Sequence, residues 1–412
     1  MALKNLTVKT NVLSATAGII LLCYMAFATV FGPYKTTFVH LALFALFSFM
    51  ILFFDSMAGE QNSKKKVAWD LLLLVASVTP LIYFILDFER LINLWGSTYL
   101  STPDLLLGSV FVVVCIEASR RQSSMLGALA ILACLYMLFG NFLPGVFGHA
   151  GMDFGRFIYT VVYTSEGLFG TGLKVAATYL FMFMVLGSVL RVSKTGDFMI
   201  DIANSALGAR IGGAAKGAMA ASAGLGTIVG SSIGNVVATG TFTIPLMKST
   251  GFQPHVAAAV ETNTSEGAQL VPPILGASAF IMVQVTGISY DIVVLAAIIP
   301  AALYYLSLYS VVHIEALRHG IKGLPADKIP SFKEKFIAGW HLLIAPIALF
   351  CFLLIGSYTV TFASLAAIFI AVTCGLVRNN TRFGLRKFVK FFSEGVSQSA
   401  QITALVISIG LI

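Results

Sequence analysis

The sequence has few charged residues and no recognisable catalytic motif. Charged residues make up 11% of its 412 residues, whereas soluble proteins have about 25%. The five cysteines are scattered through apolar runs and no two have metal-ligand spacing, which is typical of small buried side chains. The six histidines form no i,i+4 pair, and there is no phosphate-binding loop. We therefore expect neither an enzyme, nor ATP hydrolysis, nor a bound cofactor.

Long apolar runs dominate what is present. Hydrophobic residues make up 58% of the chain and the mean hydropathy is +0.91. Several runs reach about 20 residues, the length that crosses ~30 Å of hydrocarbon as a helix. The sequence predicts an all-α polytopic membrane protein. Its net charge of +8 comes from basic residues in short loops, where the positive-inside rule places them on the cytoplasmic side.

We expect about ten membrane spans. The first run, Asn11–Phe31, is too long for the core of a signal peptide and no A-x-A cleavage site follows it. Two amphipathic segments are also expected, at Asp153–Gly167 and at 380–393, and a last apolar run begins at Ile402. The spans are expected at about 11–31, 35–54, 67–86, 103–118, 124–143, 173–192, 254–286, 289–313, 337–356 and 358–377.

One segment, Gly212–Thr241, is apolar but too rich in glycine for a plain helix. It reads GGAAKGAMAASAGLGTIVGSSIGNVVATGT, mostly Gly, Ala, Ser and Thr. Its centre groups hydroxyls and an amide where a helix should break. A broken helix at membrane depth is tolerated only where it lines a cavity or a binding site. This pattern indicates a transporter.

The distribution of basic residues predicts that this segment is a re-entrant hairpin. Counting spans from a cytoplasmic N-terminus places Lys64–Lys66 and Arg120–Arg121 in the cytoplasm. The basic loops at 318–335 and 378–390 can be cytoplasmic only if Lys216–Lys248 makes an even number of crossings. Two full crossings need about 40 residues, more than this stretch has. We therefore expect it to enter the membrane and return on the same side.

The first candidate site is the hairpin tip, with Ser231, Ser232, Asn235 and Thr239. Side-chain oxygens and unpaired carbonyls suit a hard cation, and the N-termini of half-helices favour an anion. The alternative is close helix packing through small residues. Packing explains Ala214–Ala223 well but explains the Ser-Ser-Ile-Gly-Asn cluster poorly.

The second candidate is a polar island in the next span, ETNTSEGAQ at 261–269, followed at once by Pro272-Pro273. The tandem proline should break or kink the helix. Carboxylates at membrane depth are costly unless they face a bundle interior or water, so Glu261 and Glu266 are functional candidates. The alternative is that both glutamates are simply solvated near the cytoplasmic interface.

These residues resemble a known family. GSSIGNVVATGTFT at 230–243 with IPLMK at 244–248, AAAVETNTSEGAQLVPPILGASAFIM at 257–282, and 299–305 are similar to the tripartite ATP-independent periplasmic (TRAP) transporters, particularly permeases with fused small and large membrane subunits. A shared Ser-Glu-Gly in Phe157–Gly167 and Phe388–Gly395 fits an inverted repeat, with chance as the alternative. The resemblance implies a small-subunit-like part at 1–123, a linking span and loop at 124–150, and a large-subunit-like part at 151–412. Within the last part it implies a hairpin at 212–250 and a broken helix at 254–286.

The resemblance also implies an activity: sodium-driven uptake of an organic anion across the bacterial inner membrane, with the solute delivered by a periplasmic binding protein. The large subunit would move as an elevator. The residues carried over to the solute and ion site are Ser231, Ser232, Gly234, Asn235, Thr239, Thr262, Asn263, Thr264, Glu266, Gly267, Gln269, Pro272 and Pro273. Ser231 and Asn235 are candidate sodium ligands. Glu266 departs from the small polar residue expected there and leaves the coupling ion open.

The chain stops where the family's second, inverted repeat would begin. We therefore expect the first half of an inverted-repeat transporter, as a fragment, a frameshifted product or one part of a split permease. The alternative function is a membrane remnant that does not transport.

Overall fold

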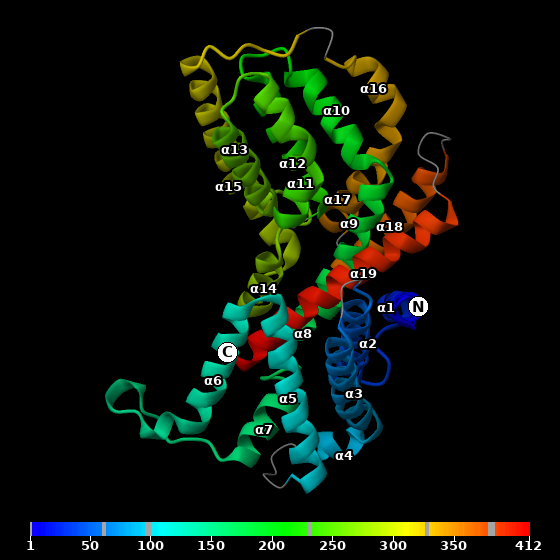
Figure 1. The fold of residues 1–412 in the computed structure, drawn as a ribbon, viewed down its shortest axis with the longest axis vertical. Coiled ribbons are helices and arrows are strands. Elements are labelled where there is room, and N and C mark those ends of the chain that lie inside the picture. Colours follow the sequence, from blue (N-terminus) through cyan, green and yellow to red (C-terminus); the bar gives the residue numbers. More distant parts are fainter. Residues whose placement is uncertain are drawn as a thin grey trace. The chain divides into compact units, whose positions relative to one another are not determined.

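The computed structural model describes residues 2–59, 63–94, 100–229, 232–325, 329–356, 358–377 and 384–412. Every secondary-structure element among these residues is a helix (Figure 1). Among them, nine helices are long and apolar enough to cross a membrane. They cover Thr10–Phe31, Thr37–Met57, Lys64–Leu86, Thr102–Gln122, Ser124–Phe142, Thr171–Arg191, Tyr290–Arg318, Phe332–Leu354 and Val360–Val377. The prediction of an all-α polytopic membrane protein is confirmed, and the tenth expected span, 254–286, is split into two shorter helices.

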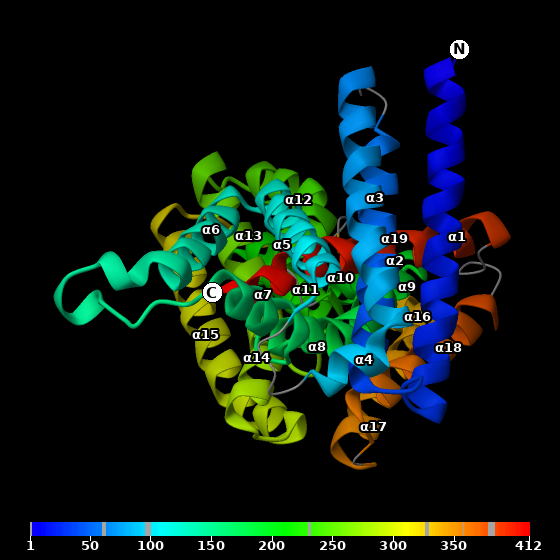
Figure 2. The same cartoon turned by 90° about the horizontal axis from the view of Figure 1, so that it is seen from below.

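The chain divides into two compact units, residues 1–181 with 392–412, and residues 182–391. The first unit contains α1 (Ala2–Phe31), α2 (Thr37–Met57), α3 (Lys64–Leu86), α4 (Phe88–Asn93), α5 (Thr102–Gln122), α6 (Ser124–Phe139), η1 (Gly140–Phe142), η2 (Gly145–Phe147), α7 (Phe154–Tyr163), α8 (Thr171–Val175) and the π-helical turn η3 (Ala176–Leu180). The end of α19 (Leu385–Ile407) and η7 (Ser408–Leu411) complete it. Helices α1, α2 and α3 lie side by side, as Figure 2 shows.

The helices of the first unit begin where the sequence supplies caps. Thr36 and Ser63 accept hydrogen bonds from the backbone amides of the first turns of α2 and α3. Such caps satisfy amide groups that have no partner inside the helix. The core between the helices is aromatic: the Phe84 ring lies 5.7 Å from that of Phe111 and 5.2 Å from that of Tyr163. Edge-to-face packing of this kind is favourable for aromatic rings.

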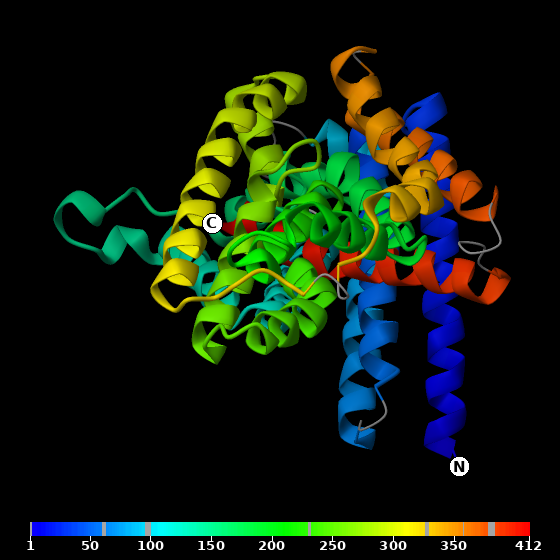
Figure 3. The same ribbon diagram turned by 90° about the horizontal axis from the view of Figure 1, so that it is seen from above.

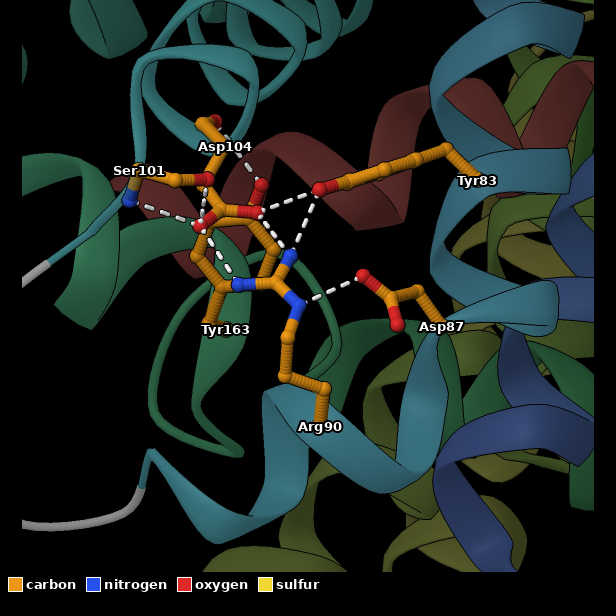
Figure 4. Close-up of polar contacts among 6 residues, drawn as sticks. All are labelled: Tyr83, Asp87, Arg90, Ser101, Asp104 and Tyr163. Atoms are coloured by element: carbon orange, nitrogen blue, oxygen red, sulfur yellow. Dashed lines mark hydrogen bonds and ion pairs between the residues drawn. The ribbon is translucent and has the colours of Figure 1, made fainter.

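A polar network centred on Asp104 connects α3, α4, α5 and α7 (Figure 4). The side chain of Asp104 is fully buried and accepts two hydrogen bonds from Arg90, at 2.6 and 3.0 Å. Tyr83 Oη donates to the same carboxylate at 2.7 Å, and Tyr163 Oη donates to the backbone carbonyl of Asp104 at 2.8 Å. Hydrogen bonds to Asp104 and Asp87 raise the pKa of the Arg90 guanidinium above its usual value. A buried carboxylate with this many donors holds its helices in one arrangement.

The second unit contains α9 (Phe181–Val192), α10 (Thr195–Leu207), α11 (Gly213–Val229), α12 (Ser232–Ser249), α13 (Pro254–Gly267), η4 (Ala268–Leu270), α14 (Ala277–Thr286), α15 (Tyr290–Arg318), α16 (Phe332–Gly339), η6 (Trp340–Leu343), α17 (Ile344–Leu354) and α18 (Val360–Val377). Helices α10 to α13 pack in succession and α15 packs against α13, which can be followed in Figures 1 and 3. Five alanines, among them Ala214, Ala218 and Ala257, contribute to a core cluster that also contains larger apolar side chains. Small side chains let helices approach closely, which is how helices associate within a membrane.

The helix break lies where the sequence predicted it, whereas the re-entrant hairpin stays a prediction, since residues 230 and 231 at its tip lie outside the described residues. Helices α11 and α12 pack against each other and neither is among the nine candidate spans. The following span breaks between η4 and α14, around a cis peptide bond between Pro272 and Pro273. The end of the chain differs in detail from the expectation: the amphipathic stretch and the last apolar run belong to one continuous helix, α19. Its buried residues Phe392, Val396, Ala400, Ala404 and Ile407 recur every three or four positions, so one buried face runs from the end of the amphipathic stretch into the last apolar run.

Candidate functional site

The centre of the candidate site is the buried carboxylate of Glu261 on α13. Its residue is only 1% exposed. Thr239 on α12 donates a hydrogen bond to Oε1, and Thr243, one turn further along α12, donates to Oε2 at 2.6 Å. Ser265 on α13 donates to Oε1 at 3.3 Å. The spacing of four residues on each helix places these hydroxyls on the faces that meet.

This carboxylate has hydroxyl donors but no basic partner. In the part of the chain that the structure describes, no ion pair includes Glu261. Hydrogen bonds from neutral hydroxyls compensate only part of the cost of burying a charge, and an isolated buried carboxylate is unfavourable by several kcal/mol, on the order of 5. The arrangement can therefore stabilise a cation brought in from outside.

Asn235 extends the polar cluster from α12 to α11. Its amide Nδ2 donates to the hydroxyl of Ser222 at 2.8 Å and lies 3.1 Å from the Ser222 carbonyl. The Ser222 hydroxyl lies 3.4 Å from that of Ser265, so the cluster continues to Glu261. The residue is fully buried, and within the described residues its Oδ1 has no hydrogen-bond partner. An unpaired buried acceptor of this kind costs about 1–3 kcal/mol and calls for an explanation such as a bound ion or water.

Two tyrosines of α15 donate hydrogen bonds to backbone carbonyls near the end of α13. Tyr304 Oη donates to the carbonyl of Asn263 at 2.7 Å, and Tyr305 Oη donates to that of Thr264 at 2.9 Å. Gly267 lies against the Tyr304 ring: a Cβ added to it would be 2.2 Å from Tyr304 Cε1. Glycine is required here because the backbone and the ring approach so closely.

The segment after the break is fixed by Tyr290 at the start of α15. Its hydroxyl lies 2.8 Å from the carbonyl of Pro273 and 2.6 Å from that of Ile274. Its ring stacks on Phe280 of α14 with the centroids 4.8 Å apart. A cavity of about 350 Å³ lies between α14 and α15, bordered by Gln269 and otherwise by mainly apolar residues. The polar cluster and this apolar cavity are thus separate features of the same broken helix.

The structure brings together some of the residues predicted for the site and separates others. Asn235 and Thr239 join the buried cluster, whereas Ser231 lies outside the described residues. Ser232 and Gly234 are half-buried at the start of α12, Thr264, Gly267 and Pro273 are buried, and Gln269 and Pro272 are half-buried. Thr262, Asn263 and Glu266 lie on the exposed face of α13. The Thr262 and Asn263 side chains donate to carbonyls one turn back, and Gln269 Nε2 donates to Glu266 at 3.0 Å.

The alternative, that both glutamates are simply solvated, is wrong for Glu261, which is buried, while Glu266 is exposed. Glu261 was named as a functional candidate, but it was absent from the residues carried over to the solute and ion site, as were Ser222, Thr243 and Ser265. A signal for three of them was present: Thr239 and Thr243 on one helix, and Glu261 and Ser265 on the next, are each four residues apart. Ser222 carried no such signal, because it belongs to an alanine-rich helix in which a serine is compatible with packing alone.

Comparison with known proteins assigns the chain to a family. The family model described as tripartite ATP-independent periplasmic transporter, DctM component, matches residues 109–412, about three quarters of the chain. The chain belongs to this family. The uncharacterized protein y4mL of Sinorhizobium fredii (strain NBRC 101917 / NGR234) is 27% identical over 145 residues, covering 35% of this chain. The match spans 34% of that relative's length.

Membership agrees with the fold. Nine apolar helices among the described residues, together with the family match, make this TRAP family chain a multi-pass bacterial membrane protein. The family match confirms the resemblance to TRAP transporters that GSSIGNVVATGTFT and AAAVETNTSEGAQLVPPILGASAFIM indicated, and both motifs lie within the matched region. The buried cluster of Glu261, Asn235 and their hydroxyl partners also lies within it.

Proposed function

We propose that this chain is the permease component of a secondary active transporter that imports an organic anion with the sodium gradient. A periplasmic binding protein would deliver the solute, and the N-terminus would face the cytoplasm. Family membership supports a permease. One observation supports cation coupling in particular: the unpaired Oδ1 of Asn235 belongs to the same buried network as the Glu261 carboxylate, which has no basic partner among the described residues.

Sodium suits this cluster chemically. Hard cations prefer oxygen ligands, and the cluster offers a carboxylate, an amide oxygen and hydroxyl oxygens on three helices. A bound Na⁺ would offset the negative charge of Glu261 and satisfy the amide oxygen of Asn235 at once. The anion would be favoured at helix N-termini, which α12 supplies at Ser232 and α14 at Ala277.

Sodium-dependent stabilisation of the purified full-length chain tests the proposal. Na⁺ should raise the melting temperature by a few degrees over K⁺ at equal ionic strength, because a ligand that binds only the folded state stabilises it. Asn235→Ala should remove this difference by deleting the unpaired oxygen. Equal melting temperatures of the wild type in Na⁺ and K⁺ would contradict the proposal.

Asn204→Ala is the matched control. Asn204 on α10 is also buried in the second unit and its Oδ1 also has no hydrogen-bond partner within the described residues, but no hydrogen bond connects it to Glu261. The substitution should leave the Na⁺-dependent shift intact even if it changes the baseline stability. Loss of the shift in both variants would mean that the effect of Asn235→Ala is structural, and the ion site would have to be sought elsewhere.

A further inference from the structure

A second cavity, of about 530 Å³ and lined by polar and charged residues, lies in the first unit and takes no part in the proposed transport site. It is formed by the end of α2, the start of α3, the end of α5 and one residue of α19. The residues that decide its chemistry are Asp55, Lys66, Trp69, Glu117, Arg120 and Arg121. The cavity therefore combines three basic and two acidic side chains at the ends of three candidate spans.

One wall of the cavity is a closed network of ion pairs. Arg121 donates to Asp70 at 2.6 Å and to Glu117 at 3.1 Å. Arg120 donates to the same Glu117 at 2.7 and 3.0 Å. Asp70 is fully buried and also accepts a hydrogen bond from Ser56 at 2.8 Å. The Arg121 guanidinium thus pairs with two carboxylates, whereas Arg120 pairs with one and retains Nη1, which no ion pair among the described residues uses.

Two charges of opposite sign remain uncompensated on the same cavity. Lys66 is exposed and forms no ion pair with any described residue. Asp55 accepts hydrogen bonds from the hydroxyls of Ser14 and Ser397 but, among the described residues, has no basic partner. A ligand that matches both would carry a negative and a positive group close together.

The position of the cavity indicates what kind of molecule reaches it. Asp55, Lys66 and Arg120 all lie in the first or last turns of candidate spans, where a bilayer has its headgroups. The Trp69 side chain is 51% exposed beside the cavity, and tryptophan is enriched at this depth of a membrane. Basic pockets between membrane helices at this level bind lipid headgroups.

We propose that this cavity binds the headgroup of a zwitterionic phospholipid that carries a primary ammonium. Lys66 and Nη1 of Arg120 hold the phosphate, and the Asp55 carboxylate accepts a hydrogen bond from the ammonium. A purely anionic headgroup would leave the charge of Asp55 without a positive partner. A quaternary choline headgroup has no N–H to donate to it.

Native mass spectrometry of the purified full-length chain with defined lipids tests this assignment. Dioleoyl phosphatidylethanolamine should bind more tightly than the phosphatidylcholine and phosphatidylglycerol of the same acyl chains. Lys66→Ala should weaken phosphatidylethanolamine binding about fivefold, the effect expected of one basic residue at a membrane surface. Asp55→Asn keeps one of the two oxygens that accept from Ser14 and Ser397. It removes the charge and should abolish the preference over phosphatidylcholine.

Lys64→Ala is the matched control, since Lys64 belongs to the same turn of α3 but does not line the cavity. It should leave phosphatidylethanolamine binding unchanged. Equal loss in Lys64→Ala and Lys66→Ala would overturn the proposal, as would equal binding of the ethanolamine and choline lipids or tighter binding of phosphatidylglycerol. Displacement of the lipid by millimolar inorganic phosphate would show a site for free anions instead and would likewise overturn it.

Discussion

The two glutamates of α13 lie on different faces of one helix. Glu266 comes five positions after Glu261, which turns its side chain by about 140° around an ideal helix relative to that of Glu261. Glu261 shares its face with the buried Ala257, Thr264 and Ser265, whereas Glu266 is exposed. The sequence placed both acids in one polar island. The two acids can be told apart only by the helical period, which places Glu261 on the face of its buried neighbours. The buried charge of Glu261 needs a compensating partner, whereas the solvated charge of Glu266 does not.

Glu261→Gln should destabilise the fold and weaken its response to sodium. Glutamine keeps the shape, but its NH₂ group replaces an acceptor that now receives a hydrogen bond from a hydroxyl. Unpairing a buried hydroxyl in this way costs about 1–3 kcal/mol of unfolding free energy. The loss of charge should also reduce the Na⁺-dependent shift in melting temperature, which thermal unfolding in Na⁺ and K⁺ would measure.

Glu266→Gln serves as the control for Glu261→Gln, because Glu266 is on the same helix but exposed. It should change the melting temperature little and keep the Na⁺ response. If Glu261→Gln were as stable as the wild type and responded equally to Na⁺, the carboxylate would be neither a structural centre nor an ion ligand.

At the scale of elements, the break between α13 and α14 was predictable and its support was not. Tandem proline removes helical hydrogen bonds, so Pro272-Pro273 predicted a break. The carbonyls near it are satisfied by Tyr304 and Tyr305, which lie about forty residues further along the chain. No local pattern relates a tyrosine on one helix to a carbonyl on another, because such a contact depends on tertiary packing. The continuity of α19 was missed for a different reason: its composition changes midway, but one buried face continues from Phe392 to Ile407.

Gly267→Ala should loosen α13 from α15. The added Cβ would lie 2.2 Å from Tyr304 Cε1, so the ring must move and its hydrogen bond to Asn263 weaken. Overpacking of this kind costs about 1–3 kcal/mol of unfolding free energy. A double-mutant cycle with Tyr304→Ala, followed by thermal unfolding, would measure the coupling between the two positions.

The expected result of this cycle is that Gly267→Ala costs much less in the Tyr304→Ala background, because the ring that it strikes is gone. An equal cost in both backgrounds would mean that the substitution acts through the helix backbone and not through α15.

At the scale of the whole molecule, composition was sufficient to predict a helical membrane protein but insufficient to predict which residues form its buried polar cluster and its headgroup cavity. Apolar runs predicted about ten spans, and the described residues contain nine helices that are long and apolar enough to cross a membrane. Each span must satisfy its own backbone hydrogen bonds, so its signal is local in the sequence. The buried cluster draws on α11, α12 and α13, and the headgroup cavity draws on α2, α3, α5 and α19. Sites assembled from several helices depend on packing, which a sequence pattern along one helix does not specify.

The predicted re-entry of the segment that contains α11 and α12 can be tested through the topology of the whole chain. If it enters the membrane and returns, the residues on either side of it face the same compartment. Arg210→Cys and Ser249→Cys, both exposed and bracketing the hairpin, should then react with a membrane-impermeant maleimide from the cytoplasmic side in a background without the five native cysteines. Val146→Cys, in the 99% exposed turn after α6, should react only from the opposite side, because one candidate span fewer precedes Val146 than precedes Arg210. Labelling of Arg210→Cys and Ser249→Cys from opposite sides would mean that the segment crosses the membrane once, and the basic loops after it would then lie outside the cell.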